Sequence, residues 1–286
     1  MLPAISFYKY NNQNNNSNKV SFKAHPDFIR LAKSYDVKAS SFFRRGSFYG
    51  SPSEQFSDIV DVFRTIFQKG DASKKKVLIA GIGDSQETFS YLAVIKSLVK
   101  DKPLKDVVDL QIVDLQSKPM IKDLQRNAFF EYPSAPDFAS DSFVKVKDDS
   151  KMYNVYRYRV NDEILDFVAD TYENAEKSKW ECRLQDALPE YPAEDFDIIS
   201  INNTLGYIKN DDERYSAIQN VLRKLKMDGT FVTDPFRDFW LKKAGVIDSF
   251  REFRANRIGA AGSIVDGETG IYKKVSNVIN PPAEEI

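Results

Sequence analysis

The stretch KKKVLIAGIGDSQETFSYLAVIKSLV, at residues 74–99, decides the fold class of this chain. It opens with a short apolar run that ends in Gly81 and Gly83, and it continues with apolar residues at helical spacing. A strand that turns through glycines into a helix is the repeating unit of a parallel α/β sheet. The pattern therefore predicts a strand, a turn that begins at Ala80, and a helix over 85–99.

The same alternation continues along the chain. Strands are expected at 107–116, 180–185, 196–203 and 229–234, and helices at 121–130, 161–175 and 211–226. Strands that alternate with helices of this length form a parallel sheet with right-handed crossovers. Two further strands at 249–259 and 270–279 predict an antiparallel hairpin at the edge of that sheet.

Three regions stand apart from this alternation. Residues 1–20 include the tract NNQNNNSN and are predicted to form a disordered tail, and residues 21–70 a small helical module. Residues 71–286 form the predicted α/β domain. Within it, residues 129–159 are a small insertion that contains a hairpin turning at Lys147–Lys151.

Composition bounds the kind of partner. The 286 residues are 42% apolar and 29% charged, which suits one large or two small folded domains, and the net charge of -1 does not support binding to nucleic acid. Residues 1–70 carry 10 Lys and Arg against 5 Asp and Glu, so this segment either docks an acidic protein substrate or balances the acidic remainder.

No apolar run approaches the roughly 20 residues of a membrane span, and the N-terminal pattern is not that of a secretory signal. We expect a soluble cytoplasmic protein without membrane insertion.

The rarest residue types narrow the chemistry. The single cysteine, Cys182, cannot form an internal disulfide, and with the single histidine, His25, it gives too few ligands for a Cys/His zinc site. No metal is expected. Cys182 falls in a predicted strand and is expected to be a core thiol. A chain with one histidine favours chemistry that needs little help from imidazole.

The first strand end is a candidate ligand loop, because ligands bind open parallel sheets at the carboxyl ends of the strands. Ala80, Gly81 and Gly83 stand there, and glycines let the backbone approach a ligand closely. The third glycine of a dinucleotide fingerprint would fall at Gln86, which disfavours pyrophosphate and NAD. An ordinary turn is the alternative interpretation of this loop.

Acidic residues follow the second and third predicted strands. Asp114, with Leu115 after it, can accept hydrogen bonds from both hydroxyls of a ribose, or it can cap a helix. Asp186, between Gln185 and Ala187, can accept from the exocyclic amine of an adenine, and it also suits a turn.

Two amides complete the series. Asn202 and Asn203 end an apolar strand, where buried unpaired amides would be costly, so they bind a polar ligand or cap the following loop. Each signal alone has a structural explanation. Four of them at successive strand ends, in the order glycine loop, acid, acid and amide pair, predict one binding site.

This order of features resembles the S-adenosylmethionine-dependent methyltransferases of the Rossmann-like class, over roughly residues 71–235. The cofactor of that class carries no phosphate, in agreement with the absent third glycine. The resemblance implies a class I fold: a mostly parallel, seven-stranded α/β sheet with an antiparallel edge strand, here behind the small helical module.

Further segments are similar to the CheR-type chemotaxis receptor glutamate methyltransferases and extend the resemblance to roughly residues 28–275. SFFR at 41–44, after Ser40, is similar to the T-x-F-F-R segment of that family. QETFS at 86–90 is similar to its G-E-E-P-Y-S run, and NNTLGY at 202–207 to R-N-V-x-I-Y. YRVNDEIL at 158–165 is similar to the segment that leaves the inserted β-subdomain of that family.

The resemblance implies roles toward the cofactor S-adenosylmethionine and its product S-adenosylhomocysteine. Glu87 would hold the methionine amine, Asp114 the ribose, and residues 185–187 the adenine region. Asn203 would line the pocket beside Asn202.

Two residues would face the methyl acceptor as catalytic residues. Arg44 can pair bidentately with an acceptor carboxylate, and Tyr207 can donate to the acceptor or stack near the sulfonium. A carboxylate is already ionised at neutral pH, so transfer to a protein glutamate needs no catalytic base, which agrees with the single histidine.

Departures from the family pattern keep alternatives open. Asn202 stands where the family usually has Arg, and Lys38 stands where an Asn often precedes the threonine. One alternative is an enzyme of the same fold that methylates a small molecule or another protein side chain. The other is a non-catalytic module that binds the cofactor or a partner.

Overall fold

The computed structural model describes residues 52–67, 73–83, 85–120, 129–132, 142–146, 156–202, 204–233, 238–253, 255–258, 264–267 and 269–280. The predicted tail, most of the predicted helical module, Lys38, Arg44 and Asn203 lie outside these residues.

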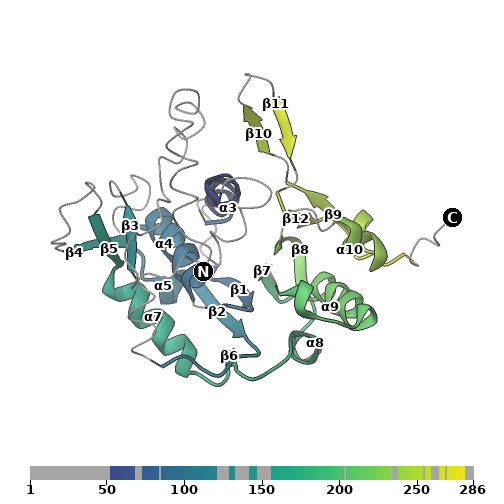
Figure 1. The fold of residues 1–286 in the computed structure, drawn as a ribbon, viewed down its shortest axis with the longest axis horizontal. Coiled ribbons are helices and arrows are strands. Elements are labelled where there is room, and N and C mark those ends of the chain that lie inside the picture. Colours follow the sequence, from purple (N-terminus) through teal and green to yellow (C-terminus); the bar gives the residue numbers. More distant parts are fainter. Residues whose placement is uncertain are drawn as a thin grey trace, which may run out of the picture.

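A seven-stranded sheet with the order β6-β2-β1-β7-β8-β12-β9 forms the centre of the described structure (Figure 1). Its strands are β1 (Lys75–Ala80), β2 (Val108–Val113), β6 (Ser178–Lys179), β7 (Phe196–Ile201), β8 (Leu225–Thr233), β9 (Phe250–Glu252) and β12 (Ile271–Lys274). The first five strands of that order are parallel, and β12 runs antiparallel to both of its neighbours. The mostly parallel α/β sheet predicted from the sequence is confirmed, with antiparallel β12 beside the edge strand β9.

Helices connect and cover the strands (Figure 1). They are α3 (Pro52–Phe67), α4 (Gln86–Val99), α5 (Leu104–Val107), α7 (Asp162–Glu173), α8 (Leu184–Ala187), α9 (Asp211–Lys224) and α10 (Asp238–Lys243), with 3-10 turns η3 (Leu188–Glu190), η4 (Leu205–Tyr207) and η5 (Ile247–Ser249). Asn161 caps α7 by accepting from the Ile164 amide at 2.9 Å, and Asn210 caps α9 in the same way.

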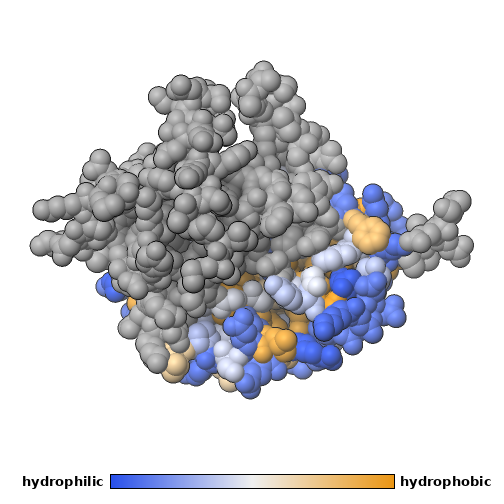
Figure 2. Space-filling model, in the orientation of Figure 1, coloured by the Kyte–Doolittle hydropathy of each residue, from blue (hydrophilic) through white to orange (hydrophobic). Residues whose placement is uncertain are grey.

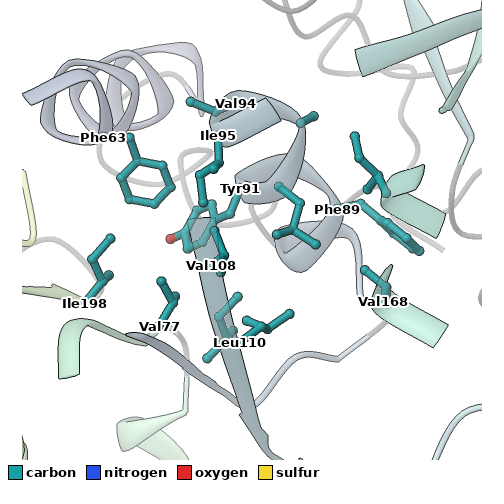
Figure 3. Close-up of a cluster of buried hydrophobic side chains, with 14 of the residues drawn as sticks. Phe63, Val77, Phe89, Tyr91, Val94, Ile95, Val108, Leu110, Val168 and Ile198 are labelled. Atoms are coloured by element: carbon teal, nitrogen blue, oxygen red, sulfur yellow. The ribbon is translucent and has the colours of Figure 1, made fainter. Parts of the chain in front are cut away.

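Alternate side chains of each central strand enter two different cores, as the period of two in a strand requires. Val77 and Ile79 pack with α3, α4 and α7 on one face of the sheet (Figure 3). Leu78 and Ala80 pack with α8, α9 and α10 on the other. Because both faces are buried, these strands are nearly continuous apolar runs in the sequence.

The insertion forms a separate three-stranded sheet of β3 (Phe129–Tyr132), β4 (Phe143–Val146) and β5 (Tyr156–Val160), in the order β3-β5-β4. The antiparallel pairing of β4 with β5 confirms the predicted hairpin. The predicted helix over 121–130 is wrong at its C-terminal end, because the backbone of Phe129 and Phe130 pairs with β5. Before β4, Ser142 Oγ donates to the Ala93 carbonyl of α4 at 2.6 Å, which ties the insertion to the main domain.

The strand predicted at 180–185 is also wrong. The sheet pairs only at Ser178–Lys179, and Leu184–Ala187 form one turn of helix in which the Ala187 amide donates to the Arg183 carbonyl. Leu184 is buried while Arg183 pairs with Asp186, so a helical turn separates the apolar and charged side chains better than a strand would. Cys182 therefore lies in a loop and is partly exposed, not a core thiol.

The predicted C-terminal hairpin is confirmed by the antiparallel pairing of β9 with β12. Between β9 and β12 lies another antiparallel pair, β10 (Ala255–Ile258) and β11 (Ile264–Gly267). β10 falls in the second half of the strand predicted at 249–259, which is therefore divided into β9 and β10, and β11 was not predicted.

The visible surface of the described part is largely hydrophilic, with small apolar areas (Figure 2). Leu115 and Tyr207 are among its exposed large apolar side chains. Within the described ranges, none of the helices has the length and apolar character of a membrane span.

Candidate functional site

The register of the sheet brings the predicted site residues to one edge. Ala80 is paired with Val113, and Ile79 with Ser200, in parallel strands. The chain therefore continues into Gly81, Asp114 and Asn202 at the same carboxyl end of β1, β2 and β7. Three of the four predicted strand-end signals meet where ligands of open parallel sheets bind.

The two glycines of the first loop have different surroundings. Gly81 has φ +71°, and a Cβ placed on it would lie 1.8 Å from Thr204 Oγ1. Thr204 Oγ1 in turn donates toward the carbonyl oxygens of Asn202 (3.0 Å) and Ala80 (3.3 Å). Gly83 has φ +56°, and a Cβ there would meet no atom of the described residues within 4 Å. Gly81 closes the loop against β7, whereas Gly83 leaves open space beside the backbone.

Asp114 is 4% exposed, and its two oxygens differ. Oδ1 accepts from the Gln116 amide at 2.8 Å, while Oδ2 is buried without a hydrogen-bond partner. The backbone on both sides is fixed, because the Asp114 amide donates to Lys179 O and its carbonyl accepts from the Cys182 amide. A rigid carboxylate with one oxygen that accepts no hydrogen bond from the described residues is suited to accept one from a ligand.

Glu87 lies in the first turn of α4 inside a buried cluster with Tyr91, Ser200 and Asn202, hereafter the Glu87 cluster. Glu87 Oε1 accepts from Asn202 Nδ2 at 2.6 Å and from Ser200 Oγ at 2.8 Å. Asn202 Nδ2 also lies 3.1 Å from the Tyr91 hydroxyl. All four residues are at most 1% exposed, and these hydrogen bonds satisfy the donor end of the Asn202 amide inside the protein.

In the part of the chain that the structure describes, three buried polar atoms without a hydrogen-bond partner belong to this edge of the sheet: Ser85 Oγ, Asp114 Oδ2 and Asn202 Oδ1. Ser85 occupies the N-cap of α4, but its side chain makes no capping hydrogen bond. Each lies just beyond a different strand: β1, β2 and β7. A fourth such atom, Tyr191 Oη, belongs to the core under α8 and α9.

Two residues predicted beside an adenine already have protein partners. Asp186 accepts from Arg183 at 2.8 and 3.1 Å, and this hydrogen bond lowers the pKa of the Asp186 carboxyl. Gln185 donates to Glu213 of α9 at 2.8 Å. Ala187 is fully buried in the core. The role of these three residues toward a ligand stays a prediction.

The other predicted residues divide by exposure. Leu115 is 68% exposed next to buried Asp114, and Tyr207 is 77% exposed at the end of η4. In the loop after β6, partial burial raises the pKa of the Cys182 thiol. Arg44 and Asn203 lie outside the described residues, so their roles stay predictions.

Sequence reasoning missed Tyr91, Ser200 and Thr204. A signal for the first two was present, because Tyr91 follows Glu87 by four residues on one helix face, and Ser200 precedes Asn202 by two on one strand face. No sequence signal places Thr204 against Gly81, which depends on how two loops meet.

The unpartnered atoms define what a ligand must offer. Asp114 Oδ2 and Asn202 Oδ1 can only accept hydrogen bonds, so they suit a ligand with hydroxyl or amine donors. The open side of Gly83 leaves room for that ligand against the backbone. The cofactor of the resembled family offers ribose hydroxyls and an ammonium, so the residues present fit it.

The strand order, with the single antiparallel β12 next to the edge strand β9, is that of a Rossmann-like α/β fold, as the resemblance implied. No protein-family model and no curated protein sequence matches the chain.

Solved structures of distant similarity were found. They include N-methyltransferase NodS from Bradyrhizobium japonicum WM9 in complex with S-adenosyl-L-homocysteine (12% identity, 82% of this chain and 93% of that chain, TM-score 0.37). The DszA carbon methyltransferase shares 14% identity over 80% of this chain and 54% of that chain, with a TM-score of 0.42. YcgJ from Bacillus subtilis shares 11% identity over 62% of this chain, and the match spans half of that protein's length, with a TM-score of 0.29.

Proposed function

We propose that this chain is an S-adenosylmethionine-dependent methyltransferase and that it transfers the methyl group to a carboxylate, that of a protein glutamate. The observation that carries the proposal is the fixed, buried Asp114 carboxylate, whose Oδ2 has no partner among the described residues, at the same carboxyl end of the sheet as the first glycine loop. The cofactor would supply a methyl group activated on a sulfonium.

The residues of this edge would each hold one part of the cofactor. Asp114 Oδ2 accepts from the ribose, as the resemblance to the CheR-type family implied. Exposed Leu115 offers apolar surface to the base. The Gly81–Gly83 loop lets the backbone lie against the ligand, because none of the described side chains occupies the space beside Gly83.

The acceptor assignment rests on the residue composition of the chain and on the roles that the resemblance implies. With one histidine in 286 residues, a carboxylate acceptor that needs no base is the simplest fit. Arg44 would hold that carboxylate, and exposed Tyr207 would contact it from the end of η4. The basic segment 1–70 would dock an acidic protein that carries the glutamate.

Calorimetric titration with S-adenosylhomocysteine tests the cofactor. Wild type should bind, and Asp114→Ala should weaken binding by about 1–3 kcal/mol, the range for a buried polar group that is left without its partner. Asp109→Ala is the matched control, since this carboxylate lies at the other end of the same strand and pairs with Lys177. A well-folded wild type that binds nothing would remove the methyltransferase proposal.

Alkali distinguishes the acceptors. A glutamyl methyl ester made with methyl-labelled cofactor releases labelled methanol in mild base, whereas N-methyl or C-methyl products keep the label. Arg44→Ala should retain cofactor binding and lose transfer. Binding without any transfer by wild type, across acidic protein substrates, would favour the non-catalytic alternative.

A further inference from the structure

The Glu87 cluster fixes which way the Asn202 amide faces. An amide has a donor end and an acceptor end, and a carboxylate oxygen only accepts. Asn202 Nδ2 lies 2.6 Å from Glu87 Oε1, so the donor end faces Glu87. Turning the amide over would place two acceptors in contact inside the protein, where little solvent screens their repulsion.

The rest of the cluster supports the same orientation. Tyr91 Oη and Ser200 Oγ lie 3.1 and 3.2 Å from Asn202 Nδ2, on the donor end of the amide. The Tyr91 ring packs against Phe63 of α3 in an edge-to-face arrangement, with 5.2 Å between the ring centroids (Figure 3). The direction of the Asn202 amide is therefore set by the core.

The acceptor end has the opposite surroundings. Asn202 Oδ1 is buried without a hydrogen-bond partner, in a residue that is 1% exposed. It lies just beyond β7, level with Gly81 at the carboxyl end of the sheet. A native buried acceptor with no partner calls for an explanation, and a ligand donor is one that its place in the sheet supports.

We propose that Asn202 Oδ1 accepts a hydrogen bond from the ammonium of the cofactor's amino-acid moiety, and that Glu87 acts as a positioning residue which keeps Asn202 Oδ1 turned toward it. An ammonium has three donors and no acceptor, which matches an idle carbonyl oxygen. This assignment rests on the proposed function, and it moves the ammonium contact from Glu87, where the resemblance placed it, to Asn202.

Two ligands isolate this contact. S-adenosylhomocysteine carries the amino-acid moiety, whereas 5′-methylthioadenosine keeps the adenosine and the sulfur without it. Calorimetry should show that Glu87→Gln lowers the affinity for S-adenosylhomocysteine by about 10- to 100-fold and the affinity for 5′-methylthioadenosine by less than about threefold. The amide of the new glutamine can donate to Asn202, which lets the Asn202 amide turn over. Ser97→Ala, at the other end of the same helix, is the matched control and should change neither affinity.

A double variant exchanges the donor and the acceptor between positions 87 and 202. In Glu87→Gln with Asn202→Asp, the new amide donates to one oxygen of the new carboxylate and leaves its other oxygen for the ammonium. Binding of S-adenosylhomocysteine should return to within about threefold of wild type. If Glu87 itself contacted the ammonium, the double variant would stay as weak as Glu87→Gln, and the proposal would be overturned.

The outcomes separate this inference from the proposed function. A wild type that binds neither ligand defeats the proposed function. A wild type that binds both, with Glu87→Gln weakening both equally or neither, defeats the positioning role alone. If circular dichroism shows that Glu87→Gln does not fold, the double variant decides. The quantity to compare is the ratio of its affinities for S-adenosylhomocysteine and 5′-methylthioadenosine. A ratio like that of wild type supports the positioning role, and a lower preference for S-adenosylhomocysteine overturns it.

Discussion

At the scale of single residues, the two glycines of the first loop serve different purposes. Gly81 is required because Thr204 fills the space where a Cβ would stand, and its left-handed φ adds a second restriction. Gly83 has the left-handed φ but open space around it. The first glycine is thus a packing requirement, and the second leaves space in which we propose that the ligand lies.

This difference predicts losses of stability of different size for the same substitution. Gly81→Ala should destabilise the protein by about 3 kcal/mol or more, from overpacking and backbone strain together, and Gly83→Ala by only about 1 kcal/mol. Urea unfolding measures both, with Gly206→Ala as a control, since its nearest atom would be Trp240 at 3.7 Å. Gly83→Ala should nonetheless weaken S-adenosylhomocysteine binding. Equal losses of stability at both positions would contradict the assignment.

The sequence revealed which residues gather at the site better than it revealed their partners. Asp114 and Asn202 were predicted because polar side chains end apolar strands, a local signal. That Glu87 accepts from Asn202 could not be predicted, because these residues are 115 apart in the chain and their contact depends on the sheet register. Asp186 looked available in the sequence, and only the structure shows that Arg183 pairs with it.

At the scale of elements, α3 is part of the core and not only a connection to the front segment. Phe63 is fully buried, with edge-to-face contacts to Tyr91 at 5.2 Å and to Phe67 at 5.9 Å. The same helix presents Arg64 to solvent, paired with Asp61. Packing on Tyr91 links this helix to the Glu87 cluster.

Phe63→Ala should therefore cost about 3–5 kcal/mol of unfolding free energy, the usual loss for a buried phenylalanine. Arg64→Ala, the neighbouring exposed position, should stay within about 0.5 kcal/mol of wild type. Urea denaturation followed by circular dichroism gives both values. A small loss at Phe63 would mean that α3 packs loosely on α4.

Strand β12 carries a fully buried lysine that should make stability depend on pH. Lys274 Nζ donates to the Leu225 carbonyl at 2.6 Å, and burial lowers the pKa of its ammonium below 10.5, with Glu194 opposing the shift. Between that lowered pKa and 10.5 the unfolded chain binds more protons than the folded one. Stability should therefore rise as the pH increases through this window.

Lys274→Met removes the titrating group, so the rise in the urea midpoint between the lowered pKa of Lys274 and pH 10.5 should become shallower. Lys273→Met is the control, because that side chain is half exposed on the same strand. An unchanged slope for Lys274→Met would assign the pH dependence to other groups.

Strands with buried side chains could be predicted from the sequence. Strands that are very short, or that only their pairing with another strand defines, could not. β1, β2 and β7 share one burial pattern, buried at five of six positions, which appears in the sequence as an apolar run. β6 is two residues long and has no such run, so the strand was placed too far along the chain. The sequence of β3 is compatible with continuing a helix, and its pairing with β5 decides otherwise.

At the scale of the whole molecule, ligand binding should be visible as a gain in thermal stability. Saturation with S-adenosylhomocysteine at about 100 times its Kd stabilises the folded state by about 2.7 kcal/mol. For a chain of this size we expect Tm to rise by roughly 5–10 °C. Asp114→Ala should show a smaller rise at the same concentration in differential scanning fluorimetry, whereas an equal rise would place the ligand elsewhere.

The place of β12 in the sheet has a consequence for synthesis on the ribosome. Every other strand of this sheet precedes β12 in the chain, yet β12 lies between β8 and β9. While translation is still running, β8 exposes an unpaired edge that a neighbouring nascent chain could join. Chaperones that shield such edges would matter most in the interval before β12 emerges.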